Sequence, residues 1–242
     1  IKEERWALGM VLPLKEEVAQ QLVGETLGQD AWGTATARHR KMLEIPFFLD
    51  KVLKDKQIIL AIGDYLRQHT GLSENSLDDV ARGAFATYRA GRSFPIDTFV
   101  IEAGPEAAEH LEKAGILVAT EGDAHFHHHL FHDYLAAHYL AAHSDEWSGS
   151  AFDTLSFNAS SFDAISKVLE QLEPDRADDF IRKVYDWNPY AAAYAISETA
   201  SSDRRLTEEM EHVITAMLAE RRWDLVRPTA MRAEDALAIL DS

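Results

Sequence analysis

The 242-residue chain contains no cysteine and no glycine that is followed by lysine. The first absence excludes disulfide bridges, cysteine-ligated zinc sites and thiol nucleophiles. The second excludes the loop Gly-x-x-x-x-Gly-Lys-Ser/Thr, whose backbone and lysine hold the phosphates of a nucleotide during hydrolysis. A Gly-x-Ser-x-Gly nucleophile elbow is missing as well. We therefore expect no catalytic residue and no enzymatic activity in this chain.

Long apolar runs are also missing. The longest, such as IPFFL (45–49) and QIILAI (57–62), are far too short to cross a bilayer. The first residues, IKEERWALGM, place acidic side chains where a signal peptide would carry a cationic region. We expect no membrane partner and a cytoplasmic location.

Basic residues are few, with 24 Lys and Arg against 41 Asp and Glu, which gives a net charge of −17. Such a surface repels phosphate backbones unless a local basic face exists. The best basic clusters, at 37–41, 204–205 and 221–222, are short. Nucleic acid is therefore an unlikely partner on charge grounds.

Amphipathic helical patterns dominate the first 115 residues, so we expect a mainly α fold. A loop with Gly33 and Thr34 interrupts them. A β-hairpin with a Gly-Asp turn is predicted over 116–128, and another helix follows it. Three helices, a hairpin and a further helix follow one another in the order of a winged-helix domain. The helices are predicted over 14–28, 57–70, 73–91, 94–103 and 104–115, with two more, broken at Pro46, over 37–56.

The last hundred residues form a succession of helical segments with short connections. Consecutive helices of this kind predict an α-solenoid of HEAT-like repeats, in which each pair buries its apolar face on the next. A loop over 144–153 is the predicted boundary. We thus expect three domains: the end of a larger core with a helical domain (1–71), a winged-helix domain (72–145) and a helical-repeat segment (146–242). The predicted repeat helices cover 160–172, 175–187, 188–200, 206–223 and 233–242.

The stretch AHFHHHLFHDYLAAHYLAAH (124–143) holds seven of the eleven histidines. His128 and His132 are four residues apart, so they share a helix face and could ligate zinc or nickel. A committed site needs a third ligand, and the Glu of the zinc-protease motif is missing. We predict no metal site, although the sequence alone leaves metal binding open. His132 next to Asp133 gives no catalytic triad geometry.

An amphipathic helix is the simpler interpretation of the same stretch. Its apolar residues form one broad stripe, from Leu130 and Phe131 to Ala141. His129, His132, Asp133 and Ala136 fall off this stripe, so we expect most of these histidines at the surface or at an edge. The first turn of such a helix carries free N–H groups and is suited to receive an anion.

Two motifs in this chain resemble those of NACHT-type STAND NTPases, the nucleotide-switched ATPases of innate-immune and antiphage sensors. FHHHLFHDYLAAHYLA (126–141) is similar to the motif that closes their winged-helix domain, roughly Phe-x-His-x-x-Phe-x-(acid/Gln)-Tyr/Phe-Leu/Phe-Ala-Ala. MLEIPFFLDKVL (42–53) resembles the motif of their first helical domain, with Pro46 at the family's proline. The resemblance covers about residues 4–145, and the order of elements agrees with it.

The resemblance implies a regulatory role. In this family the winged-helix histidine contacts the β-phosphate of ADP and holds the closed, inactive state, and the proline packs on the base. These roles fall on His128 and Pro46. The cofactors would be ADP and ATP in a full-length parent ATPase, and none is expected for this chain alone. The implied partners are an upstream NTPase domain, a protein or other ligand on the helical repeats, and further copies of the protein upon activation.

Two other interpretations remain. A free-standing helical-repeat scaffold for protein interactions would use the same amphipathic helices without an NTPase domain. A winged-helix transcription factor would place the helix over 104–115 in the major groove, but that helix offers phosphates the single cation Lys113.

Overall fold

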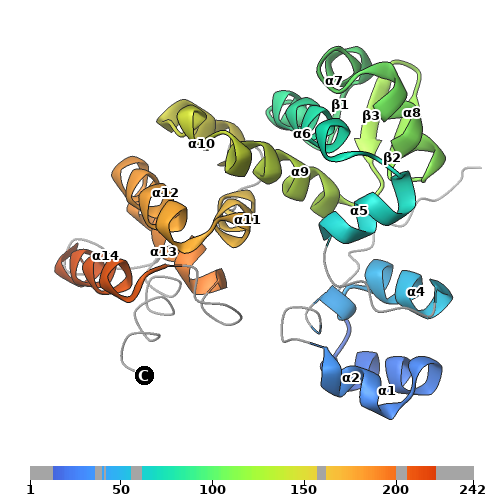
Figure 1. Cartoon of the computed structure of the whole chain (residues 1–242), viewed down its shortest axis with the longest axis horizontal. Helices are drawn as coiled ribbons and strands as arrows, with labels where there is room; N and C mark the ends of the chain where they lie inside the picture. The colour runs from blue at the N-terminus through green and yellow to red at the C-terminus, as the bar shows by residue number, and fades with distance from the viewer. Residues whose placement is uncertain are drawn as a thin grey trace, which may run out of the picture. The chain divides into compact units, whose positions relative to one another are not determined.

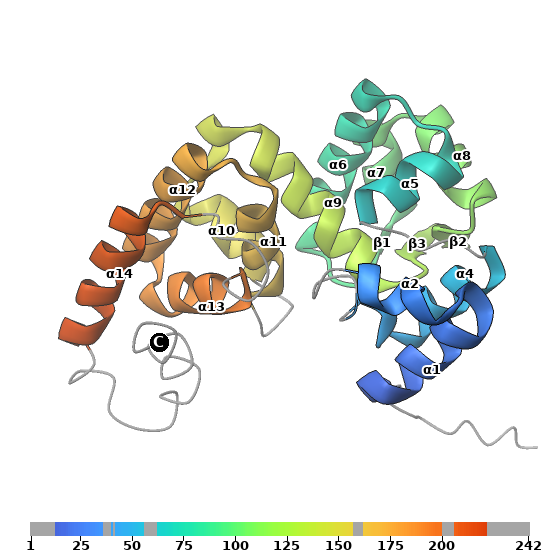
Figure 2. The same ribbon diagram turned by 60° about the horizontal axis from the view of Figure 1, so that its bottom comes forward.

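The computed structural model describes residues 13–35, 40, 42–55, 62–156, 162–199 and 206–221. Within these residues the protein is mainly helical and carries a small antiparallel sheet, which confirms the predicted fold class at this coarse level (Figures 1 and 2). The chain divides into two compact units, Ile1–Asp64 and Tyr65–Ser242. The helix predicted over 233–242 lies outside the described residues.

The first unit contains α1 (Glu16–Leu27), α2 (Gln29–Thr34) and α4 (Pro46–Asp55). Both α2 and α4 pack on α1. The loop predicted at Gly33 and Thr34 is wrong, because these residues belong to α2. That short helix forms because it buries an indole that the sequence pattern left unassigned. The core of this unit includes Ala19, Val23, Trp32, Phe48, Leu49 and Val52.

The second unit begins within α5 (Ile62–Thr70), which is followed by α6 (Glu74–Tyr88). Ser73 caps α6, since its hydroxyl accepts a hydrogen bond from the backbone N–H of Ser76 at 3.2 Å. The sequence pattern predicted that this helix ends at Gly91, whereas α6 ends three residues earlier.

The sheet has the strand order β1-β3-β2 and is antiparallel throughout. Its strands are β1 (Ser93–Pro95), β2 (Leu117–Thr120) and β3 (Asp123–Phe126). The β2–β3 hairpin was predicted, but β1 was not, because Phe94 was assigned to the following helix. Phe94 is buried, and the flanking Ser93 and Pro95 are exposed, which is the alternation of an edge strand.

The hairpin turn lies one residue earlier than predicted. Its two central residues are Glu121 and Gly122, with φ of 49° and 95°. Positive φ at both positions is the geometry of a two-residue hairpin turn, and Asp123 already belongs to β3. Two helices separate β1 from the hairpin: α7 (Ile96–Ala103) and α8 (Pro105–Lys113). Pro105 stands at the first position of α8, where the missing N–H of proline removes no helical hydrogen bond.

The helix that follows the hairpin, α9 (His129–Ala142), packs on α6 along one side and on α11 (Asp163–Gln171) along another. The predicted single apolar stripe is therefore wrong: His132, Asp133 and Ala136, assigned to the outer face, are all buried. Two neighbouring helices cover more of α9 than one stripe could occupy.

The remaining helices are α10 (Gly149–Ser156), α12 (Pro174–Trp187), α13 (Pro189–Thr199) and α14 (Glu208–Arg221). Among them, α10 contacts α11 and α12, and α13 contacts α11 and α12. The loop predicted over 144–153 is wrong, since the 3-10 helix η1 (Ser144–Glu146) and the first half of α10 occupy it. Trp147 lies between these two and is 6% exposed, so this segment folds around a buried indole.

None of the helices in the described ranges combines the length and apolarity needed to cross a membrane.

Candidate functional site

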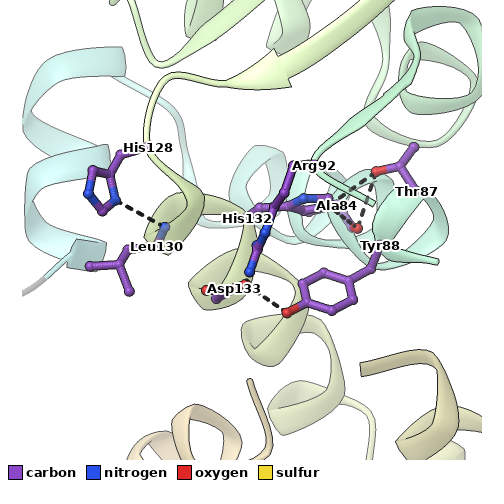
Figure 3. Close-up of polar contacts among 8 residues, drawn as sticks. All are labelled: Ala84, Thr87, Tyr88, Arg92, His128, Leu130, His132 and Asp133. Carbon is purple, nitrogen blue, oxygen red and sulfur yellow. Dashed lines mark hydrogen bonds and ion pairs between the residues drawn. The ribbon is translucent and has the colours of Figure 1, made fainter. Parts of the chain in front are cut away.

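The junction between β3 and α9 is set by His128. This residue is the N-cap of α9, with extended backbone (φ −132°, ψ 134°). Its Nδ1 accepts a hydrogen bond from the backbone N–H of Leu130 at 3.2 Å (Figure 3). A ring nitrogen thus takes the place of the hydroxyl or carboxylate oxygen that usually caps a helix.

The cap also fixes the proton on the His128 ring. Because Nδ1 accepts, the neutral imidazole carries its hydrogen on Nε2. Burial lowers the pKa of His128 to about 4, and the neighbouring His129 acts in the same direction. At neutral pH the ring is therefore uncharged, its Nδ1 accepts from the helix, and its Nε2 carries the hydrogen.

Pro46 lies in the first unit, at the first residue of α4, as the sequence predicted. A proline is suited to this position because the first N–H of a helix has no intrahelical partner. Its side chain is half-buried.

One turn after His128, His132 is fully buried, with 1% exposure. Its Nε2 donates to the backbone carbonyl of Ala84 on α6 at 3.0 Å. The rings of Tyr88, Phe94 and Phe126 surround it, with centroids 4.8, 5.2 and 5.0 Å away. Burial lowers the pKa of His132 to about 4, against the opposing effects of the Ala84 carbonyl and Asp133. The ring is a neutral core residue.

Asp133 is the next residue and is also buried, at 1% exposure. Its Oδ1 accepts from the hydroxyl of Tyr88 and from the guanidinium of Arg92, both at 2.6 Å (Figure 3). Burial and the adjacent carboxylate raise the pKa of Tyr88, so its hydroxyl stays protonated. Burial lowers the pKa of Arg92, but the hydrogen bond to Asp133, the charge of Asp133 and the contributions of Tyr88 together raise it, so the net change is upward.

This network, formed by Tyr88, Arg92, His132 and Asp133, was missed by the sequence analysis. The signal was present in the aspartate: an acid inside an Ala- and Leu-rich helix must find donors if it is buried. Its two partners lie more than forty residues away on α6 and the following turn, and no local pattern identifies them.

A hollow of about 300 Å³ opens beside the network. It lies where the β1–β3 edge meets the first turns of α9. Six residues line it: Arg92, Ser93, His125, Phe126, His129 and His132.

The other histidines of the cluster are dispersed. His125 and His127 are exposed, and the Nδ1 atoms of His138 and His143 contact Gln171 and the Tyr139 carbonyl, respectively. In the described part of the chain, no three His, Asp or Glu side chains come together as a metal site would require. The histidines of this stretch therefore have different partners and different degrees of burial.

No protein-family model, curated protein or solved structure matches this chain.

Proposed function

We propose that this chain is the regulatory part of a nucleotide-switched NTPase of the NACHT-type STAND class, which holds the ADP-bound inactive state and relays ligand sensing to oligomerisation. The protein would act in the cytoplasm as an innate-immune or antiphage sensor. This chain would not itself hydrolyse ATP. The proposal assigns 1–71 to the end of the NTPase core and the first helical domain, 72–145 to a winged-helix domain and 146–242 to helical repeats.

The element order of the second unit supports the winged-helix assignment. Helix α6, strand β1, helices α7 and α8, and the hairpin β2–β3 follow one another, with β3 in the middle of the sheet. A helix, a strand, two helices and a two-stranded wing are the parts of such a domain. In the same way, the packing of α10 to α13 on one another supports the start of a helical-repeat array.

The observation that carries the proposal is the state of His128. His128 lies between the β2–β3 hairpin and α9. Its Nδ1 accepts a hydrogen bond from the Leu130 N–H, so the hydrogen of the neutral ring is on Nε2. The ring also lies at the positive end of a 14-residue helix dipole. A diphosphate oxygen is a suitable acceptor for this N–H, and the resulting hydrogen bond to an anion is of the strong kind.

The switch follows from that contact. With ADP bound, His128 and Pro46 would hold the winged helix and the first helical domain against the NTPase core. Replacement of ADP by ATP, favoured by a ligand on the repeats, would remove this hold and free a surface for oligomerisation. A differential affinity of only about 5 kcal/mol between the two states suffices to reverse their populations.

The test uses the natural protein that contains this chain, with ADP affinity measured by calorimetry. His128→Asn preserves the helix cap, because the Asn oxygen accepts from the same N–H, but it removes the imidazole donor. We expect ADP to bind about tenfold more weakly, since a hydrogen bond to a charged group contributes about 1.5–3 kcal/mol, and basal activity to rise.

The matched control is His127→Gln, which changes an exposed neighbouring imidazole. It should leave the ADP affinity at the parent value. Equal ADP affinity in His128→Asn and the parent would refute the proposal and favour the alternative, a free-standing helical-repeat scaffold.

A further inference from the structure

We propose that the hollow beside α9 binds a small planar hydroxy-carboxylate, a ligand with an aromatic body, one carboxylate and one hydroxyl. This inference goes beyond the proposed switch. It concerns residues of the second unit alone and needs neither His128 nor an NTPase domain.

The polar groups that line the hollow include one cation and several side chains that can donate hydrogen bonds. They are the Arg92 guanidinium, the Ser93 hydroxyl and the imidazoles of His125, His129 and His132. Among the residues that the structure describes, no carboxylate lines the hollow, although the whole chain carries a net charge of −17. This wall favours an anion, because an anion can accept from the Arg92 guanidinium and the Ser93 hydroxyl.

Arg92 can hold the ligand carboxylate. One of its terminal nitrogens is bound to Asp133, which keeps the side chain in place, and the side chain is still 49% exposed. A guanidinium has several N–H groups, so the remaining donors can form the paired hydrogen bonds that carboxylates favour. The hydroxyl of Ser93, the next residue, lies on the same wall.

His132 supplies the second recognition element. Its ring lines the hollow and is 1% exposed, and Nε2 donates to the Ala84 carbonyl. The neutral ring therefore presents Nδ1 as an acceptor, and across the described ranges no protein group donates to it. A buried acceptor without a donor costs stability, and a ligand hydroxyl would satisfy it.

Phe126 and the flat imidazole rings of the lining favour a ligand with a planar aromatic ring. Phe126 is 5% exposed, and its ring centroid lies 5.0 Å from that of His132. Planar aromatic surfaces favour a planar aromatic partner. The volume of about 300 Å³ lies at the lower end of the range for small-molecule sites, so a single ring fits better than a nucleotide.

The probe is 4-hydroxybenzoate, titrated into the full 242-residue chain by calorimetry. Benzoate lacks the hydroxyl and phenol lacks the carboxylate, so each should bind at least about fivefold more weakly if both recognition elements act. The ¹⁵N resonance of His132 Nδ1 provides an independent readout. It should shift on addition of 4-hydroxybenzoate, because a new hydrogen bond forms at that nitrogen, and it should shift less with benzoate.

Two variants locate the site. Arg92→Gln with Asp133→Asn replaces the ion pair by a neutral amide pair, leaves no buried charge alone, and should weaken 4-hydroxybenzoate binding at least about tenfold. Ser93→Ala is a milder change on an exposed residue and should weaken it a few-fold. The control His110→Gln alters an exposed imidazole on α8 and should bind as the parent does.

The outcomes are separable. No heat of binding, an unmoved His132 resonance, or undiminished binding in both wall variants would overturn this inference. If the double variant does not fold, Ser93→Ala and the His132 resonance still decide it. His128→Asn should leave 4-hydroxybenzoate binding unchanged, so a failure here does not touch the proposed nucleotide switch, and a failure of the switch does not touch this site.

Discussion

The hydroxyl of Tyr88 on α6 donates to Oδ1 of Asp133 on α9 at 2.6 Å, between two side chains that are almost completely buried. This bond ties α6 to the helix that follows the hairpin. Arg92 donates to the same oxygen from the turn after α6. The buried carboxylate is thereby neutralised and bonded, and the start of α9 is held at a fixed register on α6.

Tyr88→Phe tests this bond. The change removes one donor from a buried carboxylate and leaves the ring in place, so we expect the free energy of unfolding to fall by about 1–3 kcal/mol. Urea denaturation measures it. Tyr190→Phe, at a 40% exposed position on α13, should change it by less than about 0.5 kcal/mol. If both variants match the parent, the bond contributes nothing to stability.

Because His132 is buried as a neutral ring, we predict that the free energy of unfolding falls in mild acid. Its pKa is about 4 in the folded chain and 6.5 without burial, so between these values the unfolded chain binds a proton that the folded chain does not. Stability therefore falls as the pH falls from about 6.5 to 4, by up to about 3 kcal/mol from this residue. Asp133 and Arg92 face the ring and act in opposite directions.

The matching variant is His132→Gln, whose amide can still donate to the Ala84 carbonyl. Chemical denaturation at pH 7 and pH 5 should show a smaller difference between the two pH values for this variant than for the parent. His128 and His129 also have lowered pKa values and retain part of the dependence. An unchanged difference would mean that His132 is not the residue responsible.

Gly83 lies where α6 and α7 pack closely against each other. A Cβ at this position of α6 would lie 2.9 Å from the Cβ of Ala103 and 3.0 Å from the ring of Phe99 on α7. Gly83→Ala should therefore destabilise the protein by about 1–3 kcal/mol through overpacking. Gly33→Ala on α2 meets nothing within 4 Å and should be neutral or stabilising by up to about 1 kcal/mol. Thermal unfolding compares them, and equal effects would contradict the packing.

The helix cap can be tested on this chain alone. His128→Ala removes the acceptor of the Leu130 N–H and should lower the free energy of unfolding by about 0.5–2 kcal/mol, whereas His128→Asn should stay near the parent. Urea denaturation of both variants measures the difference. Equal destabilisation by Ala and Asn would show that the imidazole acts by packing and not as a cap.

Local chemistry predicted much of the fold. Ser73, Pro46 and Pro105 each begin a helix as their residue types require, and Gly122 lies in the hairpin turn. The errors occurred where burial depends on distant partners. Trp32 and Trp147 each draw a short segment into a helix that periodicity does not reveal, and the strand at Phe94 exists because β3 pairs with it.

For the candidate site, too, local patterns were informative and contacts with distant segments were not predicted. His128 and Pro46 were candidate site residues by motif register; both lie at the starts of helices, and their nucleotide-binding role stays a prediction. The sequence pattern placed His132 and Asp133 at the surface, since one apolar stripe on α9 left them outside. Their burial follows from α6, which covers this part of α9, and from Tyr88 and Arg92, which supply donors from a distant segment. Pairings of this kind are not present in a local pattern.

The sequence of the natural protein upstream of Ile1 tests the central claim most directly. The account predicts a loop Gly-x-x-x-x-Gly-Lys-Ser/Thr within about 150–200 residues, one domain's length, before this chain. Such a loop would supply the phosphate-binding wall that His128 and Pro46 would complete. A natural chain without that loop would contradict the nucleotide switch and leave His128 as a helix cap in a helical scaffold.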